Sequence, residues 1–474
     1  MSRLLFLFTL ILTFVSHATS TTIHVPGDQP TIQAGLNTAA EGDTVLVAAG
    51  TYFENIIWPA VNGVKLIGSG EDECIIDGDS LASVIRFEEN LAGIIDNSTL
   101  ISGFTIQNGH ATGNPPQNMG GGIYCYESSP GLIDMILTGN IATDGGGIYC
   151  ESSSPLMEDV TITGNSSTTR GGGIGCYYSD PGLSDVILSN NDADEGAGIY
   201  FHASSPTVTG AFIYNNSAVS GGGGIFCSGS NPQLNNVLLY RNTSLADGGG
   251  ICCSGASPTL LQVTLSENSA ASGGGIHCKY GSHPVLENCI MWNDSPQEGS
   301  FLQNSAANSL SISCSDIQGG ETGIETNGNG IVYWLENNIS ADPWFCNPEN
   351  DYRLQLNSPC RTDVCGFMGY TGETCDGEGV EGLVTEPSTF HLVQNYPNPF
   401  NPSTTIDYSV AAPSEVTLSV YNINGQLVDV IHDGFMQAGY HTAPWTPSDL
   451  SSGIYFVELR AGVDRDVMKV SYVK

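Results

Sequence analysis

The phrase Gly-Gly-Gly-Ile-x-Cys, followed by a Ser-Pro turn, a short apolar stretch and an Asn, recurs seven times between Gly120 and Asp294 with small variations. Its isoleucines set a period of 25 or 26 residues: Ile123, Ile148, Ile174, Ile199, Ile225, Ile251 and Ile276. A repeat this short cannot bury its own apolar face, so neighbouring copies must stack around one continuous core. The chain is therefore predicted to fold as a solenoid.

Two other repeat folds compete with stacked β-coils. Leucine-rich repeats share the period and the apolar frame before the Asn, but they need a second apolar segment after it, where this chain has small polar residues and glycines. A propeller blade needs about 40 to 50 residues. Ile123 and Cys125 are two positions apart, as strand residues on one face are. The pattern predicts an all-β fold, a right-handed parallel β-helix, with the handedness that is usual for parallel β connections.

Two segments resemble known families. Residues 22–56, TTIHVPGDQPTIQAGLNTAAEGDTVLVAAGTYFENI, resemble the opening of the pectin-lyase-like right-handed β-helix superfamily, in which a short helix (here about Thr31–Ala40) caps the solenoid. Residues 140–148, NIATDGGGI, resemble the repeats of chlamydial polymorphic outer-membrane proteins. The resemblance implies a β-helix over residues 21–345. This scaffold hosts lyases, hydrolases and adhesins, so it leaves the function open.

The N-terminus has the pattern of a secretory signal peptide. Arg3 precedes the apolar run Leu4–Val15, and the small-residue stretch Ser16–Ala18 follows. The run is too short to span a bilayer, and no later stretch is long and apolar enough to do so. We expect residues 1–20 to be removed on export, with no transmembrane segment in the protein.

The C-terminal region carries four motifs in order. They are NYPNPFNP from Asn395, YNxxG from Tyr421, SGIYF from Ser452, and a basic last strand ending at Lys474. Together they resemble the type A C-terminal sorting domain of the bacterial type IX secretion system. The resemblance implies an immunoglobulin-like β-sandwich over residues 389–474, after a linker at 381–388, and export to the medium or the outer surface of a Gram-negative bacterium. The partner implied is the type IX secretion machinery; an ordinary immunoglobulin-like domain is the alternative.

Four cysteines follow the solenoid closely. Cys346, Cys360, Cys365 and Cys375 lie in a segment, residues 346–380, whose YRLQLNSPC phrase resembles the closing segments of secreted bacterial β-helices. In a secreted chain they are expected to form two disulfides, with three pairings open. A zinc site is the rival, but the spacings lack Cys-x-x-Cys pairs.

Two columns of the repeat are predicted to be structural. Cysteines in phase with the isoleucines should point inward as packed thiols. They are Cys125, Cys150, Cys176, Cys227, Cys253 and Cys278, with Phe201 in the same column. The asparagines should stack at a corner and satisfy backbone groups there. They are Asn140, Asn165, Asn191, Asn216, Asn242 and Asn268.

Two further columns are candidates for function. Aromatic residues beside the isoleucines should face outward and could stack on sugar rings, or they could merely stabilise the sheet. The glycan-binding candidates are Tyr124, Tyr126, Tyr149, Tyr177, Tyr200, His202 and Phe226. Asp134, Asp159 and Asp185 recur one coil apart and form a candidate Ca²⁺ site, with solvated surface aspartates as the alternative.

Charge restricts the partners. The formal net charge is −37, from 49 acidic and 12 basic residues. Phosphate contacts require Lys and Arg, so nucleic acid is excluded as a partner and anionic membrane surfaces are disfavoured. Only 13% of residues are charged and 40% are hydrophobic, so the chain can still build a large core.

The motifs of catalytic superfamily members are absent from the sequence. The lyases use a Ca²⁺-binding acidic cluster with basic residues, and polygalacturonases use an aspartate set with Gly-His-Gly and Arg-Ile-Lys. In residues 22–342 the basic residues lie far apart: Lys65, Arg86, Arg170, Arg241 and Lys279. We expect a non-enzymatic adhesin or carbohydrate-binding protein that needs no cofactor other than Ca²⁺, with an extracellular polysaccharide or a neighbouring cell surface as partner. A polysaccharide lyase or glycoside hydrolase with a divergent active site is the alternative, and a structural spacer is a third.

Overall fold

The computed structural model describes residues 20–88, 91, 93–302, 306–347, 351–362, 364–370, 391–392, 400, 402–410, 413–422, 425–436, 439–447, 450–461 and 464–472. The chain divides into two compact units, Met1–Gly377 and Glu378–Lys474. The predicted signal peptide, apart from Ser20, and the predicted linker at residues 381–388 lie outside the described residues. No helix within the described ranges is long and apolar enough to cross a membrane.

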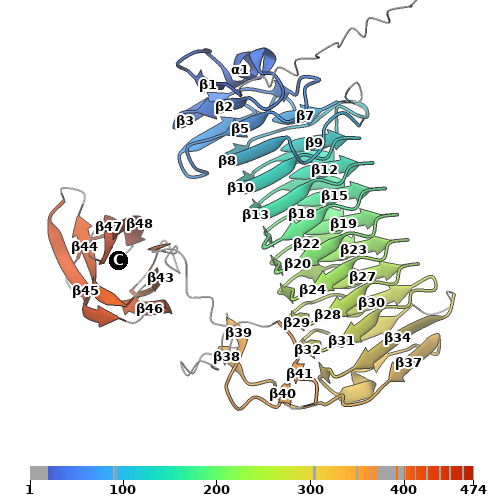
Figure 1. The fold of residues 1–474 in the computed structure, drawn as a ribbon. Coiled ribbons are helices and arrows are strands. Elements are labelled where there is room, and N and C mark those ends of the chain that lie inside the picture. Colours follow the sequence, from blue (N-terminus) through green and yellow to red (C-terminus); the bar gives the residue numbers. More distant parts are fainter. Residues whose placement is uncertain are drawn as a thin grey trace, which may run out of the picture. The chain divides into compact units, whose positions relative to one another are not determined.

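The first unit is a parallel β-solenoid of coils stacked from α1 (Ile32–Thr38) at one end to β37 (Gly330–Trp334) at the other (Figure 1). Three sheets run along the stack, and every pairing between successive coils within them is parallel. Sheet A, as described, contains β1 (Thr22–Val25), β2 (Thr44–Val47), β3 (Gly50–Phe53), β5 (Lys65–Ile67), β6 (Cys74–Asp77), β8 (Leu100–Gln107), β10 (Gly131–Thr138), β13 (Leu156–Thr163), β16 (Gly182–Ser184), β17 (Ile187–Ser189), β20 (Thr207–Thr209), β21 (Phe212–Tyr214), β24 (Gln233–Asn235), β25 (Leu238–Tyr240), β28 (Thr259–Leu261), β29 (Thr264–Ser266), β31 (Val285–Glu287), β32 (Ile290–Trp292), β34 (Asn308–Ser313), β35 (Asp316–Ile317) and β37.

The other two sheets are shorter. Sheet B contains β4 (Ile56–Ile57), β7 (Ile85–Phe87), β9 (Ile123–Tyr126), β12 (Ile148–Glu151), β15 (Ile174–Tyr177), β19 (Ile199–His202), β23 (Ile225–Ser228), β27 (Ile251–Ser254), β30 (Ile276–Lys279), β33 (Gly299–Phe301) and β36 (Ile324–Glu325). Sheet C contains β11 (Ile141–Asp144), β14 (Ser166–Arg170), β18 (Asp192–Glu195), β22 (Ser217–Gly221) and β26 (Thr243–Ser244). The predicted all-β, parallel solenoid with coils of 25 or 26 residues is confirmed.

Helix α1 closes the N-terminal end of the solenoid. The Thr31 side chain accepts a hydrogen bond from the Ala34 N–H, and the Glu54 carboxylate accepts from the Ile32 and Gln33 N–H groups. These acceptors satisfy backbone donors that the first turn of a helix leaves unpaired. Ile32 and Leu36 are fully buried against the first coil, so the short helix covers the open end of the core.

The core is one continuous apolar cluster inside the coils. The isoleucine column and the cysteine column of sheet B point inward and are at most 1% exposed. All six cysteines of that column keep their thiols. These residues and the inward aliphatic side chains of sheet A, such as Leu132 and Leu137, belong to the same buried cluster.

A ladder of buried asparagines runs along one corner. The Asn165 Oδ1 accepts hydrogen bonds from the Asn140 backbone N–H and side-chain Nδ2, each at 3.0 Å. The same pattern repeats down the column to Asn268, whose N–H and Nδ2 donate to Asp294 Oδ1. Each Nδ2 also donates to a sheet A carbonyl, as Asn165 does to Leu137 at 2.9 Å. The ladder thus satisfies polar groups that the corner would otherwise bury unpaired.

A second ladder, of serines, was not predicted. From Ser153 onward, each hydroxyl oxygen accepts from the backbone N–H of the serine one coil earlier, at 3.0 Å for the bond from Ser128 to Ser153. The column consists of buried serines two residues before the repeat prolines: Ser128, Ser153, Ser179, Ser204 and Ser230. That constant offset from proline is the signal by which the sequence could have shown it.

A C-terminal cap follows the last coil and packs on the outer face of sheet A. It consists of β38 (Phe345–Asn347), β39 (Asp351–Leu354), β40 (Arg361–Thr362), β41 (Gly366–Phe367) and residues 368–370. The Gly369 N–H donates to the Asn288 carbonyl, and the Tyr370 N–H donates to Thr264 Oγ1. Tyr370 also packs edge-on against Phe212. The cap therefore covers apolar side chains that would otherwise face solvent.

The cysteine pairing differs from the prediction. Cys365 is bonded to Cys314 of the solenoid, outside the predicted set. Cys360 keeps a buried thiol, which donates to Asp316 Oδ2 at 2.9 Å. Cys346 is disulfide-bonded, and Cys375 lies outside the described residues. The prediction of two disulfides within the set was wrong because the cap folds back along the solenoid, which places Cys365 rather than Cys360 beside a coil cysteine.

The second unit is a small antiparallel β-sandwich. One described sheet contains β42 (His391–Leu392), β43 (Thr404–Val410) and β46 (Gly439–Trp445). The other has the order β45 (Leu427–Met436), β44 (Ser414–Asn422), β47 (Gly453–Ala461) and β48 (Asp464–Tyr472). Val416, Leu418, Val457 and Leu459 are fully buried between the sheets. The predicted sandwich is confirmed.

Candidate functional site

The aromatic column of sheet B is continuous but buried. Tyr124 and Tyr149 stack with ring centroids 5.8 Å apart, and Tyr200 and Phe226 stack at 5.4 Å. Exposed fractions are only 0%, 3%, 4% and 4% for these four side chains. The expectation that this column forms an exposed strip was therefore wrong.

Sheet C and the glycine turns explain the burial. At the end of most sheet C strands the chain turns at a left-handed glycine, such as Gly145 with φ of +66°, and then enters the next strand of sheet B. A Cβ atom at Gly145 would lie only 2.7 Å from the Tyr149 Cβ, so the turn rests directly on the aromatic column. Only glycine allows this approach. The glycine run in the sequence was thus a signal that this outward face is covered.

Two basic side chains lie over rings of the aromatic column of sheet B. The Arg86 guanidinium lies 4.1 Å from the Tyr124 ring centroid, and the Lys279 ammonium lies 5.3 Å from that of Phe226. Gly175 interrupts the column, and Tyr177 from the neighbouring column fills the gap, 5.2 Å from Tyr149. These contacts are cation–π and aromatic packing within the fold, and they leave no ring face for a ligand at these positions.

Three side chains do reach the surface together. Tyr177 and His202 are partly exposed, as is the candidate Tyr126, and Tyr178 is 64% exposed. The Tyr178 and His202 rings meet edge to face at 5.5 Å, and Tyr177 lies 5.7 Å from His202. We call Tyr177, Tyr178 and His202 the tyrosine–histidine patch. Tyr178 was not among the predicted candidates because it lies one position beyond the end of β15.

The backbone at Tyr178 is strained. Its φ is +51°, in a column of left-handed residues that directly follow the sheet B strands from β9 to β30. The column contains Glu127, Ser152, Tyr178, Ala203, Gly229, Gly255 and Tyr280. A residue with a Cβ in this conformation costs about 1–2 kcal/mol, and the chain uses glycine at two of the equivalent positions. The exposed Tyr178 ring recovers little of that cost through burial.

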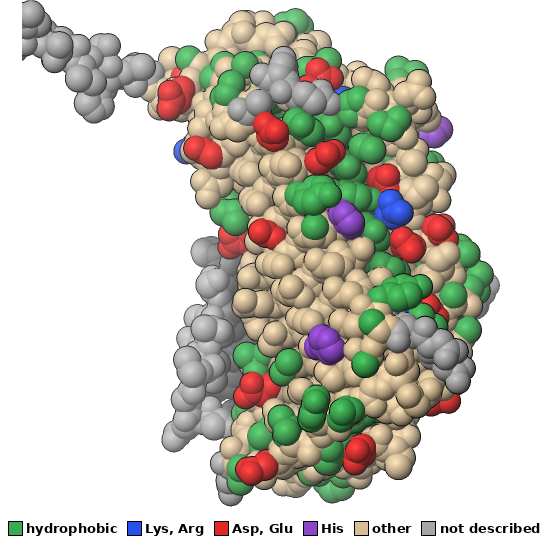
Figure 2. Space-filling view, turned by 90° about the vertical axis from the view of Figure 1, so that its right-hand side faces the viewer, with side chains coloured by type: hydrophobic (Ala, Val, Ile, Leu, Met, Phe, Trp, Pro, Cys, Tyr) green, Lys and Arg blue, Asp and Glu red, His purple; other side chains and the backbone are tan. Residues whose placement is uncertain are grey.

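Polar groups border the patch. The Tyr177 hydroxyl lies 3.3 Å from Asp144 Oδ1, and the Arg170 Nε donates to Glu195 Oε2 at 3.1 Å. Burial is the main cause that raises the pKa of the Tyr177 phenol, so this hydroxyl stays protonated at neutral pH. Figure 2 shows one face of the molecule on which hydrophobic side chains form small separate groups, with acidic side chains scattered among them and few Lys or Arg. The patch combines aromatic surface with hydrogen-bonding groups.

The aspartate column has a conformational explanation. Asp134, Asp159 and Asp185 have φ between +50° and +53°, and the column continues as Gly210 and Asn236, also left-handed. Asp, Asn and Gly are the residues that tolerate this conformation best, so the corner between sheet A strands selects them. Burial, then the charges of Asp185 and Asp134, raise the pKa of Asp159. In the part of the chain that the structure describes, no three His, Cys, Asp or Glu side chains are placed to hold a metal ion. A Ca²⁺ site here stays a prediction.

A serine, a histidine and an aspartate also meet at one corner of the solenoid. The His277 Nδ1 lies 2.7 Å from Ser300 Oγ, and its Nε2 lies 3.8 Å from Asp247 Oδ2. The combination matches a hydrolytic triad in composition, but Ser300 and His277 are each only 1% exposed. Burial also lowers the pKa of His277. No substrate can reach this serine in the folded protein, so the network is structural.

A pair of buried carboxyl groups ends the asparagine ladder. Asp294 and Glu298 are 7% and 3% exposed, and the Asp294 N–H donates to Glu298 Oε1 at 3.3 Å. Among the described residues, Asp294 Oδ2 and Glu298 Oε2 have no partner that meets hydrogen-bond geometry. Burial raises the pKa of Asp294 to about 7 and that of Glu298 to about 10. The 26-residue step from Asn268 to Asp294 was the sequence signal for this pair.

Comparisons with known families agree with both units. Residues 48–213 and 195–340 match the model of the right handed beta helix region, and residues 394–472 match the secretion system C-terminal sorting domain. No curated protein matches the chain. The sorting domain indicates export by the type IX system, either to the medium or to the cell surface. Because the β-helix matches span more than half of the sequence, the chain belongs to the right-handed β-helix family and carries a type IX sorting domain at its C-terminal end.

Proposed function

We propose that this exported β-helix protein is a glycan-binding adhesin and that the tyrosine–histidine patch contacts the sugar. The observation that carries the proposal is Tyr178, a 64% exposed aromatic side chain held beside His202 on a strained, left-handed backbone. Strain that burial does not repay is found preferentially where a residue binds something. The two long sheet faces are less suitable, since one is covered by glycine turns and part of the other by the cap.

The chemistry of the patch fits a saccharide. The apolar face of a sugar ring packs on an aromatic ring, while its hydroxyl groups need nearby donors and acceptors. Tyr178 and His202 offer ring surface, and the Tyr177 hydroxyl, Asp144 and Arg170 offer polar groups beside it. Tyr178 is 64% exposed, so the patch fits an extended polysaccharide that touches several coils better than an enclosed small molecule.

The test is binding of the mature protein to a polysaccharide array, with Tyr178→Gly as the variant. Glycine is better suited than tyrosine to this φ, so unfolding free energy should stay the same or rise by up to about 1 kcal/mol. Binding should weaken about tenfold, the equivalent of one lost stacking contact. Tyr280→Gly is the matched control, because Tyr280 is 58% exposed in the same left-handed column.

Other outcomes decide against the proposal. Binding that survives Tyr178→Gly, or that falls equally with Tyr280→Gly, would remove the patch as the site. If no polysaccharide on the array is bound, the structural-spacer hypothesis remains. Release of reducing ends or unsaturated uronates from a polysaccharide would establish the enzymatic alternative.

Loss of binding in the presence of a chelator would support Ca²⁺ at Asp134, Asp159 and Asp185.

A further inference from the structure

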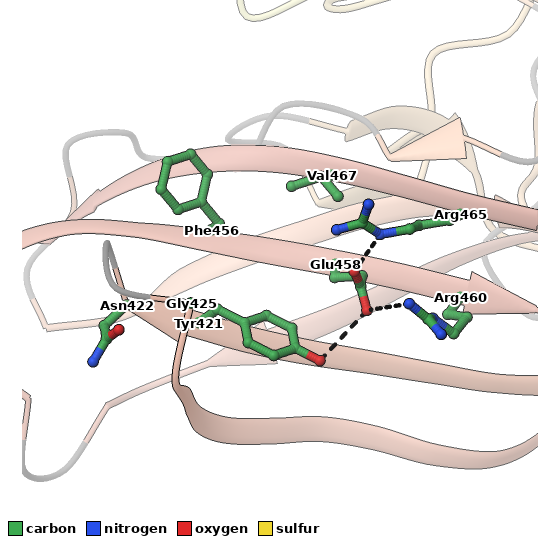
Figure 3. Close-up of a pocket in the computed structure, with 8 residues that line it drawn as sticks. All are labelled: Tyr421, Asn422, Gly425, Phe456, Glu458, Arg460, Arg465 and Val467. Atoms are coloured by element: carbon green, nitrogen blue, oxygen red, sulfur yellow. Dashed lines mark hydrogen bonds and ion pairs between the residues drawn. The ribbon is translucent and has the colours of Figure 1, made fainter.

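We propose that the outer face of the four-stranded sheet in the sorting domain docks an acidic protein surface of the export machinery, through a pocket built on Arg460 and Arg465. The pocket has a volume of about 450 Å³ and opens on the β44, β47 and β48 side of the sheet. Its lining includes Tyr421, Phe456, Glu458, Arg460, Arg465 and Val467 (Figure 3). This inference stands on the sorting domain alone and does not depend on glycan binding.

The two arginines are brought together against their own repulsion. Arg460 and Arg465 are direct partners in the antiparallel ladder of β47 and β48. Like charges in that position destabilise a sheet. Here Glu458, 6% exposed, lies between them, as Figure 3 shows. Its Oε1 is 3.3 Å from Arg460, and its Oε2 accepts from the Arg465 Nε.

The buried carboxylate orients the pair and leaves their outer sides to solvent. The Tyr421 hydroxyl donates to Glu458 Oε1 at 3.4 Å, which fixes the carboxylate further. The Arg460 and Arg465 side chains remain 56% and 59% exposed. Each guanidinium has five N–H donors, more than one shared carboxylate can accept. The donors that face outward form a preset fork, which suits a second carboxylate.

The walls of the pocket favour a protein partner over a phosphate-bearing polymer. Tyr421, Phe456 and Val467 supply apolar and aromatic surface beside the arginines. Aromatic residues and arginine are the types enriched in protein interfaces. A phosphate-bearing polymer offers no apolar side chain to contact this wall, whereas an acidic side chain with apolar neighbours meets both the guanidinium groups and the apolar wall.

The distribution of charge along the chain supports the same partner. Four of the 12 Lys and Arg residues are Arg460, Arg465, Lys469 and Lys474, within the last 15 positions. The chain as a whole has a net charge of −37 and would repel an acidic surface almost everywhere else. Complementary charge at this one end would orient the encounter with the machinery.

The first experiment replaces both arginines with glutamine in the full chain, expressed in the producing bacterium. The exported fraction, measured by immunoblot of medium and surface against periplasm, should fall about tenfold. The purified full chain should also bind poly-L-glutamate about tenfold more weakly than wild type at low salt. Glu415→Gln is the matched control, because Glu415 is an exposed charged residue of β44 outside the pocket, and it should change neither result.

A conservative pair of substitutions controls for misfolding of the glutamine variant. If the double glutamine variant has a lower melting temperature than wild type, the double variant Arg460→Lys with Arg465→Lys is tested as well. It keeps the positive charge opposite Glu458 but removes the planar guanidinium groups. It should still weaken export and poly-L-glutamate binding several-fold. Wild-type export and poly-L-glutamate binding in these variants would overturn the proposal. Tighter binding of wild type to polyphosphate than to poly-L-glutamate would also overturn it, in favour of a phosphorylated saccharide or lipid partner.

Discussion

Two cations of the solenoid and two of the sorting domain are used in opposite ways. In the solenoid, Arg86 and Lys279 lie over aromatic rings and their side chains are only 9% and 13% exposed. In the sorting domain, Arg460 and Arg465 are more than half exposed although both contact one buried carboxylate. Arg86 and Lys279 thus cover buried aromatic rings, whereas the arginine pair presents its charge to solvent.

The difference follows from how each unit covers its sheets. In the solenoid every coil repeats the same path, so whatever covers one outward residue covers its equivalents in the next coils. The position after the sheet B strand is exposed in most coils, and Tyr178 differs from its equivalents there by its ring contact with His202. The antiparallel sandwich buries one face of each sheet and leaves the other outside. In a repeat protein, the exceptions to the repeat are therefore the better candidates for function.

The largest expected effect tests how the solenoid holds its cap. Cys314→Ser opens the disulfide to Cys365, which spans 51 residues. Loop-closure entropy alone corresponds to about 4 kcal/mol for a loop of this length. We expect the cap to leave the outer face of sheet A, with a lower urea midpoint for the first unit and increased binding of a hydrophobic dye. The sorting-domain transition should not move.

Cys360→Ala is the control for this prediction. It removes a buried thiol of the same cap without removing a disulfide. An equal loss in both variants would show that packing of the cap, rather than the covalent link, holds it in place.

The next effect tests the close approach of the glycine turns. A Cβ atom at Gly146 would lie 2.5 Å from the carbonyl oxygens of both Gly172 and Ser166. Because both contacts are to backbone, Gly146→Ala should lower the unfolding free energy of the solenoid by about 3 kcal/mol in urea titration. Gly229→Ala meets no atom within 4 Å, and its left-handed φ of +56° should cost only about 1 kcal/mol.

Gly425 of the sorting domain sharpens this comparison. It too is left-handed, with nothing within 4 Å of an added Cβ. Gly425→Ala should therefore resemble Gly229→Ala and not Gly146→Ala. A large loss at Gly425 would contradict the view that crowding of glycine is special to the solenoid.

A further effect is a pH dependence of the solenoid. Burial raises the pKa of Asp294 to about 7 and that of Glu298 to about 10, above their unfolded values. The folded state therefore holds more protons than the unfolded state above about pH 4, and stability should fall as pH rises through 7 toward 10. We expect the unfolding free energy of the first unit, measured by urea titration, to be lower at pH 9 than at pH 5.

Neutral replacements of the two carboxyl groups should remove this slope of unfolding free energy against pH. Asp294→Asn with Glu298→Gln takes away both titrating groups and continues the asparagine ladder by one step. The variant should be more stable than wild type at pH 9. Glu287→Gln, at an exposed position of β31, should leave the slope as it is. A slope that persists in the double variant would assign it to other buried carboxyl groups, such as Asp316.

The sequence predicted the features that depend on repetition. The period determined which isoleucines and cysteines point into the core, because alternation along a strand and stacking between coils leave one arrangement. It also placed the asparagines in one column. The sorting domain followed from motif order, with both its fold and its role in export.

Features that depend on the path of the chain between strands were not predictable in the same way. Alternation indicated that Tyr149 points away from the core, but an outward side chain is not exposed when the turn at Gly145 lies directly on it. The partner of Cys365 depended on where the cap runs. The left-handed φ of Asp134 and its equivalents is a property of the backbone that composition does not show, so this reason for the aspartate column could not be predicted from the sequence.

The asparagine ladder has a direction. Every rung donates its backbone N–H and its amide toward the next coil, and every oxygen accepts from the previous one. The small dipoles of these groups therefore align and add, with their positive end toward the C-terminal coils, as in the first turn of an α-helix. The chain places a carboxyl group, Asp294, at that end. A stack of neutral side chains thus has an electrical polarity, and an extra coil should be accepted before Asp294 more readily than after it.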